Sequence, residues 1–339
     1  MSRRIVVACW GSHGDLNPYI GLAVALKNRG HRPVVTTMPM YRENVEKEGV
    51  EFAAAGPQVD INDRELFARV MHPRKGTERI VRELVLTALS QTYDEMRATM
   101  RGADAAVSHP LTFTVPIIAE RERLPWLSTV LAPISFLSDS DLCVLPMFPG
   151  LRPGSRLNDW LLRTLKRVAD GQVQRWVKPI YDLRAGLGLP RGGNPVFEGQ
   201  FSPFGTLALY SRVLGAPQPD WPPHVTQTGC VFYNAPDGLG RELEAFLAAG
   251  PPPLVFTLGT SAVGAAGRFY HESAAAAIRL GMRAVLLTGG IAENQPDFPL
   301  PDSVLLVDRA PHQQLFPHAV AIVHQCGAGT LGQALRAGK

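Results

Sequence analysis

Two side chains able to accept a proton lie two positions apart near the start of the chain. They are His13 and Asp15, in the sequence GSHGDLNP at 11–18, which directly follows the apolar run Ile5–Trp10. Imidazole and carboxylate groups are common general bases in enzymes, so this loop is a candidate catalytic site. A purely structural role is the alternative, because Asp and Asn residues often cap the N-terminus of a helix.

A glycine-rich sequence near the other end of the chain has the character of a phosphate-binding loop. The sequence HQCGAGT at 324–330 joins a predicted strand, Ala321–Cys326, to a predicted helix, Thr330–Ala337. Glycines before a helix allow backbone N–H groups to approach an anion, and the positive end of the helix dipole attracts it. We therefore predict that this loop binds a diphosphate.

Two further glycine-containing sequences bear on the kind of phosphate group that this half of the chain is expected to bind. The sequence GAGTLG at 327–332 also satisfies the dinucleotide pattern GxGxxG, but it follows the fourth predicted strand of its half instead of the first, which disfavours a nicotinamide enzyme. The residues Gly259, Thr260 and Ser261 follow another predicted strand. They are candidate phosphate contacts, with helix capping as an equal alternative.

Other polar sequences are better explained by structure. Asp139-Ser140-Asp141 matches the DxD pattern of some metal-dependent sugar-nucleotide enzymes, but a solvated loop or a cap is the favoured interpretation, and we predict no metal site. Ser108-His109 ends a predicted strand and could line a cleft beside Asp15, whereas His271 is expected to be structural.

The elements that must position these loops alternate as in an α/β protein. The run Ile5–Trp10, a helix at Pro18–Arg29 and a strand at Pro33–Met38 form a βαβ unit, hence a parallel sheet. The further expected strands are Asp104–Ser108, Trp126–Leu131, Thr206–Tyr210, Leu254–Gly259, Ala284–Gly289, Val304–Asp308 and Ala321–Cys326.

This alternation predicts two Rossmann-like, doubly wound parallel-sheet domains. Gly215–Pro223 (GAPQPDWPP) is the best linker candidate, so the domains are expected at 1–220 and 221–339. The second alternation stops after one short helix, and we expect that domain to be incomplete by on the order of 60 residues or more.

Long segments outside the minimal sheets are expected to form a pocket wall or lid. They are a helix at Thr77–Met100, the irregular apolar segment Ala132–Gly154, and a helix at Ser155–Leu187 that contains Trp160 and Trp176.

Charge and composition exclude several other classes of protein. The chain has 34 Lys and Arg against 30 Asp and Glu, and this small excess is scattered along it with no run of Lys and Arg, so no nucleic-acid site is predicted. No apolar stretch is long enough for a membrane span. The four cysteines, Cys9, Cys143, Cys230 and Cys326, are far apart, which fits buried thiols in a reducing cytoplasm.

Taken together, these sequences resemble the family 1 glycosyltransferases of the bacterial flavonoid, macrolide and sterol type, which have the GT-B architecture. The resemblance covers nearly the whole chain. It is strongest in GSHGDLNP at 11–18 and in VDRAPHQQLFPHAVAIVHQCGAGTLGQALRAGK at 307–339. It implies that the N-terminal half binds a hydroxylated apolar acceptor and that the C-terminal half binds a nucleotide sugar, with a UDP-sugar as co-substrate and no other cofactor.

The resemblance also implies roles for individual residues. Asp15 falls where the family has its catalytic base, with His13 as the second choice. The nucleotide would be bound by Arg309 and Ala310 at the base, His312 near the ribose, His324 or Gln325 at the phosphates, and Gly327, Ala328, Gly329 and Thr330 at the diphosphate loop. Gln325 replaces the usual phosphate-binding His, and Arg309 replaces an aromatic or apolar stacking residue.

The expected reaction is an inverting, metal-independent transfer of a hexose. Two alternatives remain open: a GT-B-like sugar-nucleotide epimerase, and a non-catalytic or inert nucleotide-binding fragment.

Overall fold

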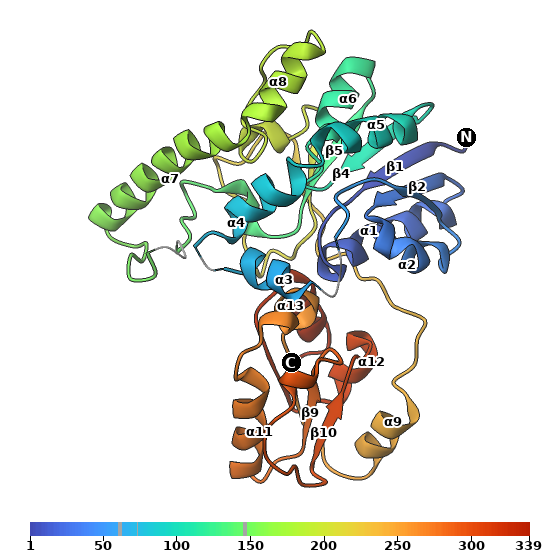
Figure 1. Cartoon of the computed structure of the whole chain (residues 1–339), viewed down its shortest axis with the longest axis vertical. Coiled ribbons are helices and arrows are strands. Elements are labelled where there is room, and N and C mark those ends of the chain that lie inside the picture. The colour runs from blue at the N-terminus through green and yellow to red at the C-terminus, as the bar shows by residue number, and fades with distance from the viewer. Residues whose placement is uncertain (60–62, 73, 145–147) are drawn as a thin grey trace. The chain divides into compact units, whose positions relative to one another are not determined.

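The computed structural model describes residues 1–59, 63–72, 74–144 and 148–339. The chain divides into two compact units (Figure 1). The first consists of Met1–Gly11, Pro18–Asp63 and His72–Val231, and the second of Phe232–Lys339 with the short segments Ser12–Asn17 and Arg64–Met71. Part of the predicted segment Ala132–Gly154 lies outside the described residues, at positions 145–147.

The first unit is built on a parallel sheet of seven strands in the order β3-β2-β1-β4-β5-β6-β7. The strands are β1 Arg4–Ala8, β2 Arg32–Thr37, β3 Glu51–Ala54, β4 Ala105–Ser108, β5 Trp126–Val130, β6 Thr206–Ala208 and β7 Val225–Gln227. Every predicted strand of this half is present, with ends that differ from the prediction by at most two residues. The apolar run of β1 is central and buried, as parallel strands covered on both faces require.

Two strands of this sheet were not predicted from the sequence. β3 and β7 are short, and their residues are only partly buried. They therefore have no continuous apolar run to reveal them. Both are edge strands of the sheet, where one side of the backbone needs no partner strand.

The helices before residue 232 differ from the predictions mainly at their ends and breaks. They are α1 His13–Asn28, α2 Arg42–Glu46, α3 Arg64–Val70, α4 Gly76–Arg79, α5 Leu89–Met100, α6 Thr114–Glu122, α7 Arg156–Trp176 and α8 Lys178–Gly186. Between them are the π-helical segment η2 Ile80–Val85 and the short turns η1 Pro39–Tyr41, η3 Pro133–Phe136 and η4 Glu198–Gln200.

The predicted start of the first helix at Pro18 is wrong. α1 begins at His13 and contains Pro18 in its interior. Pro18 has no N–H to offer the carbonyl of Gly14, but the first turn is secured by Ser12, as described below. The long helix expected at Thr77–Met100 is interrupted by η2, a π-helical segment.

The helix expected at Ser155–Leu187 is also two helices. The break falls at Val177, before the proline at the start of α8. Pro179 has no N–H to donate to the carbonyl of Arg175, four residues earlier, so the helix does not continue unbroken through this point.

The expected linker Gly215–Pro223 packs on the first unit. Trp221 stacks on Phe136 with ring centroids 4.2 Å apart, and a Cβ on Gly215 would lie 2.6 Å from Pro133. β7 follows this segment and pairs with β6. The first sheet thus continues past residue 220, and the second unit takes up the chain from Phe232.

The second unit has a four-stranded parallel sheet in the order β10-β9-β8-β11. Its strands are β8 Leu254–Thr257, β9 Ala284–Leu287, β10 Val304–Val307 and β11 Ala321–His324. Its helices are α9 Arg241–Ala248, α10 Gly259–Ala262, α11 Phe269–Arg279, α12 His312–Leu315 and α13 Ala328–Arg336, with short turns η5 Val263–Ala265, η6 Ala292–Asn294 and η7 Phe316–His318.

Side chains alternate across this sheet and form a core on each face. Val255 packs with residues of α9, α12 and α13 on one face, and its neighbour Phe256 packs with Tyr270 and Ala274 of α11 on the other. Helices on both faces are the predicted doubly wound arrangement, and the predicted α/β fold class is confirmed.

Candidate functional site

Asp15 lies in the first turn of α1, immediately after the carboxyl end of β1. Both the backbone N–H and the hydroxyl of Ser12 donate to Asp15 Oδ2, at 2.8 and 2.9 Å. An acidic side chain that reaches back to the residue before the helix caps its N-terminus. Asp15 therefore has the capping role foreseen as the alternative, and these bonds also fix the orientation of its carboxylate.

The residues next to this turn come from neighbouring strands. Tyr19 of α1 contacts the ring of His109 edge to face, with centroids 5.7 Å apart, and its hydroxyl meets that of Thr129. His109 follows β4, which pairs with β1, and Nδ1 of its ring accepts the N–H of Leu111 at 3.2 Å. Ser108 and His109 thus lie at the edge of the sheet where α1 begins, but both side chains are buried.

The segment after β5 is clamped from two sides. Asp220 accepts bonds from the hydroxyl of Ser138 (2.6 Å) and the N–H of Asp139 (2.5 Å). Lys166 of α7 forms an ion pair with Asp139 at 2.8 Å. The contacts support the structural interpretation of this DxD sequence, and they identify Asp220 as a residue that the sequence analysis missed because it lay in an apparent linker.

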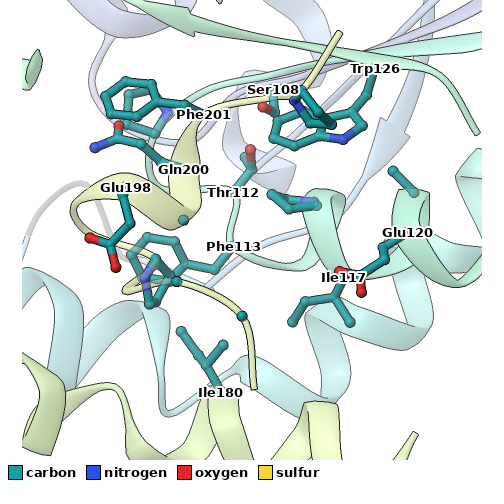
Figure 2. A pocket seen from close by; sticks show the side chains of 18 of the residues that line it. Ser108, Thr112, Phe113, Ile117, Glu120, Trp126, Ile180, Glu198, Gln200 and Phe201 are labelled. Carbon is teal, nitrogen blue, oxygen red and sulfur yellow. The ribbon is translucent and has the colours of Figure 1, made fainter. Parts of the chain in front are cut away.

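A cavity of about 570 Å³ lies along α6 in the first unit. Figure 2 shows Ile117 and Glu120 on one side of it, Phe113 and Glu198 on the other, and Ile180 of α8 below. It extends from Ser108, at the end of β4, to Trp126, at the start of β5, so it runs along the flank of the sheet. Its lining is mainly apolar.

The helix that contains Trp160 was expected to form part of a pocket wall. Trp160 instead exposes 58% of its surface, and no residue of α7 lines the cavity. α8 does line it, through Ile180 and Arg184, and Arg184 forms an ion pair with Glu120 at 2.7 Å. The expectation holds for the second of the two helices only.

In the second unit, two loops follow the adjacent strands β8 and β11. Thr257 of β8 is paired with His324 of β11, which places Gly259 next to Gln325. A Cβ on Gly259 would lie 2.6 Å from the amide nitrogen of Gln325 and 3.4 Å from the hydroxyl of Thr330. Gly259 has a φ of +62°, so both space and conformation require glycine here.

The loop after β11 leads directly into α13. Gly327 is the residue that precedes the helix, and Cys326 has a left-handed φ of +62° with its N–H donating to Nδ1 of His324 at 3.0 Å. The N–H groups of the first helical turn, at Ala328, Gly329 and Thr330, have no carbonyl within the helix to bond. This geometry suits an anion at the helix N-terminus.

Two histidines near this loop are held neutral at pH 7. Burial and the nearby His324 lower the pKa of His312 to about 4, and burial also lowers the pKa of His324. His312 stacks on Phe316 with centroids 4.4 Å apart. The two imidazoles can therefore form hydrogen bonds, but they bring no positive charge to a bound phosphate.

Arg309 and Ala310 follow β10, at the other edge of the sheet from β11. Arg309 is exposed, whereas Ala310 packs against the core that contains Leu315. A third glycine loop, which was not predicted, follows the internal strand β9. Its residues Gly289 and Gly290 have φ of +75° and +73°, and Gly289 had been predicted as the last residue of a strand.

The predicted residues thus form two groups. The candidate bases His13 and Asp15 lie together at the start of α1. The candidate nucleotide contacts lie at or after the carboxyl ends of β8, β10 and β11 in the second sheet: Gly259, Thr260, Ser261, Arg309, Ala310, His312, His324, Gln325, Gly327, Ala328, Gly329 and Thr330.

Residues 5–134 match the N-terminal domain of glycosyltransferase family 28. The chain is 29% identical to O-mycaminosyltylonolide 6-deoxyallosyltransferase of Streptomyces fradiae, over 99% of this chain and 78% of the relative. It is 17% identical to the crystal structure of the glycotransferase of kitacinnamycin, with a TM-score of 0.69 over 99% of this chain and 79% of that one. This chain is a glycosyltransferase of the GT-B fold.

The same glycosyltransferase also resembles part of a longer enzyme. It is 26% identical to the sterol 3-beta-glucosyltransferase of Leptosphaeria maculans over 98% of its own length, but it spans only 23% of that relative. The predicted resemblance is confirmed. The matches give no support to the epimerase alternative.

Proposed function

We propose that this glycosyltransferase transfers a hexose from a nucleotide sugar, most simply a UDP-sugar, to a hydroxyl of an apolar small molecule with inversion at the anomeric carbon. The observation that carries the proposal is the loop between β11 and α13. There glycine backbone and a helix N-terminus lie beside Gly259 of the neighbouring strand, as a diphosphate site needs.

In the proposed mechanism the acceptor hydroxyl loses its proton to Asp15 and attacks the anomeric carbon. The bond from that carbon to the diphosphate oxygen breaks, and the diphosphate leaves with the electron pair. Backbone N–H groups of residues 327–330 and the dipole of α13 stabilise the growing negative charge. Because His312 and His324 are neutral, this stabilisation comes from dipoles and not from imidazolium. His13 is the second candidate for the base.

An apolar acceptor is supported by two observations. Tylonolide and sterol compounds are the acceptors in the names of the two relatives. In addition, Ile134, which follows β5 at the carboxyl edge of the first sheet, exposes 54% of its surface.

The direct test offers the chain UDP-glucose and TDP-glucose with sterol, macrolide and flavonoid acceptors, and with hydrophilic sugars as a comparison. We expect a glycoside of an apolar acceptor whose anomeric configuration is opposite to that of the donor, as measured by NMR. A product with retained configuration would exclude the single displacement. Conversion of the donor without any acceptor would support the epimerase instead.

A cytoplasmic location is part of the proposal. Cys143, Cys230 and Cys326 are free thiols, which suits a reducing compartment. Fractionation of cells that express the tagged chain tests this, and recovery outside the cytoplasm would contradict it.

A further inference from the structure

One helix of this glycosyltransferase, together with its flanks, carries a large excess of positive charge. Residues 152–178 contain seven Lys and Arg and two Asp, a net charge of +5. The whole chain carries +4, so all the other residues together carry −1. The segment comprises α7 with a few residues at each end, on the flank of the first unit (Figure 1).

The outer face of α7 is apolar as well as basic. In 21 residues only Leu162 and Val173 are buried. Leu157, Trp160 and Val168 expose 65, 58 and 57% of their surfaces, and their spacing places them on one side of a helix. An apolar stripe of this kind is uncommon on a surface that only meets water.

The basic side chains of α7 and its flanks lie on two different faces of the helix. Lys166 and Arg163 point inward. Lys166 forms an ion pair with the carboxylate of Asp139, and Arg163 donates to the backbone carbonyl of the same residue. These two contacts hold α7 on the first unit. Four arginines, by contrast, are exposed, and none has an ion pair in the described part of the chain: Arg152, Arg156, Arg167 and Arg175.

We propose that α7 docks on an anionic membrane surface. A helix with Trp and Leu on one side and Arg beside them lies in the interface between lipid headgroups and acyl chains, and cationic side chains add attraction to anionic lipid. α7 is too highly charged to span the bilayer, and no helix among the described residues is long and apolar enough to do so. A nucleic-acid surface would use the arginines but would leave Leu157 and Val168 exposed to water.

This docking would bring the enzyme to acceptors that partition into the membrane. That consequence rests on the proposed function, but the docking itself does not, because it is measured without turnover.

The experiment measures binding of the full chain to vesicles of phosphatidylcholine alone and of phosphatidylcholine with phosphatidylglycerol. We expect binding to the anionic vesicles that weakens at high salt. It should be accompanied by a blue shift of tryptophan emission that Trp160→Phe removes. The triple variant Arg156→Gln, Arg167→Gln, Arg175→Gln should lower the affinity about a hundredfold.

A matched triple variant controls for net charge. Arg212→Gln, Arg241→Gln and Arg279→Gln remove three exposed charges elsewhere and should leave binding nearly unchanged. Leu157→Ser with Val168→Ser should weaken binding without lowering the thermal midpoint, because both side chains are exposed in the folded chain.

Three results would overturn the proposal. The first is equal binding, or no binding, to neutral and anionic vesicles. The second is an equal loss in both arginine triples. The third is a dimer in sedimentation analysis that Leu157→Ser dissociates, which would make the stripe a contact between copies of the chain.

Discussion

In the proposed reaction, side chains act at the carboxyl edge of the first sheet, whereas backbone amides act at the carboxyl edge of the second. At the first sheet the candidate groups are side chains, Asp15 and His13, and hydrogen bonds from Ser12 hold the carboxylate in place. At the second sheet the candidate groups are mainly backbone amides, exposed by glycine at Gly259 and Gly327. The same strand–loop–helix arrangement thus presents a candidate base after one sheet and a candidate anion site after the other.

This difference predicts how the candidate site at the carboxyl edge of each sheet should respond to mutation. A site made of one side chain loses its function when that side chain changes. A site made of several amides is damaged only when the backbone is displaced, because each N–H contributes a part of the total.

The largest effect is expected at the side-chain edge. Asp15→Asn keeps an oxygen that can accept the bonds of Ser12 but cannot take a proton, so we expect kcat to fall by about a thousandfold. The affinity for UDP, measured by calorimetry, should not change. His13→Asn should have a much smaller effect. If His13→Asn proves the more damaging change, His13 is the base and Asp15 only caps the helix.

The neutral histidines near the loop between β11 and α13 predict that the stability of the second unit falls at acid pH. The folded protein resists protonation of His312, whose pKa is lowered to about 4, whereas an unfolded histidine takes a proton near pH 6.5. Stability is therefore complete above about pH 6.5 and is lost as the pH falls toward 4, by on the order of 2 kcal/mol between pH 7 and pH 5.

Denaturant unfolding at several pH values measures this loss. His312→Gln should reduce the slope of stability against pH below pH 6.5. An unchanged slope would show that His312 is protonated as easily in the folded chain as in the unfolded one.

Displacing the glycine loop should weaken nucleotide binding moderately. In Gly259→Ala the new Cβ would lie 2.6 Å from the Gln325 amide, so we expect the Kd for UDP to rise about tenfold as the adjacent loop shifts. Gly281→Ala is the matched control. It has a similar φ of +63° and no atom within 4 Å of the new Cβ, so it adds the same backbone strain without the clash. Equal Kd values for the two variants would reject the role of the loop.

The smallest effect is expected at the clamp of the first unit. Asp220→Ala removes the acceptor for Ser138 and Asp139 and should loosen the segment after β5. If the lost hydrogen bonds weaken acceptor binding by about 1 kcal/mol, the KM for the acceptor should rise roughly fivefold, with the KM for the donor unchanged. Asp302→Ala, at an exposed position in the second unit, is the control. A fall in kcat with no change in acceptor KM would speak against a positioning role.

Nine of the eleven strands that the structure describes and the two candidate loops could be predicted because each has a local signal. Runs such as Leu254–Gly259 are apolar over several residues, and glycines before a helix are visible in the sequence. The start of α1 was misplaced because Pro18 suggests a first turn, whereas the capping bonds of Ser12 decide it.

The remaining differences depend on tertiary contacts. β3 and β7 are edge strands without an apolar run. The segment that contains Trp221 has the composition of a linker, but stacking on Phe136 fixes it to the first unit. The outer face of α7 is visible only once burial is known, because Trp160 and the buried Leu162 are equally apolar in the sequence.

Hydrogen–deuterium exchange of the wild-type chain with and without UDP tests the central claim most directly. If backbone amides of the second unit bind the diphosphate, residues 258–261 and 325–331 should exchange more slowly when UDP is present. If those amides are unaffected, and protection occurs only elsewhere, for example along the cavity beside α6, then the loop between β11 and α13 is not the nucleotide site and the proposed reaction is wrong.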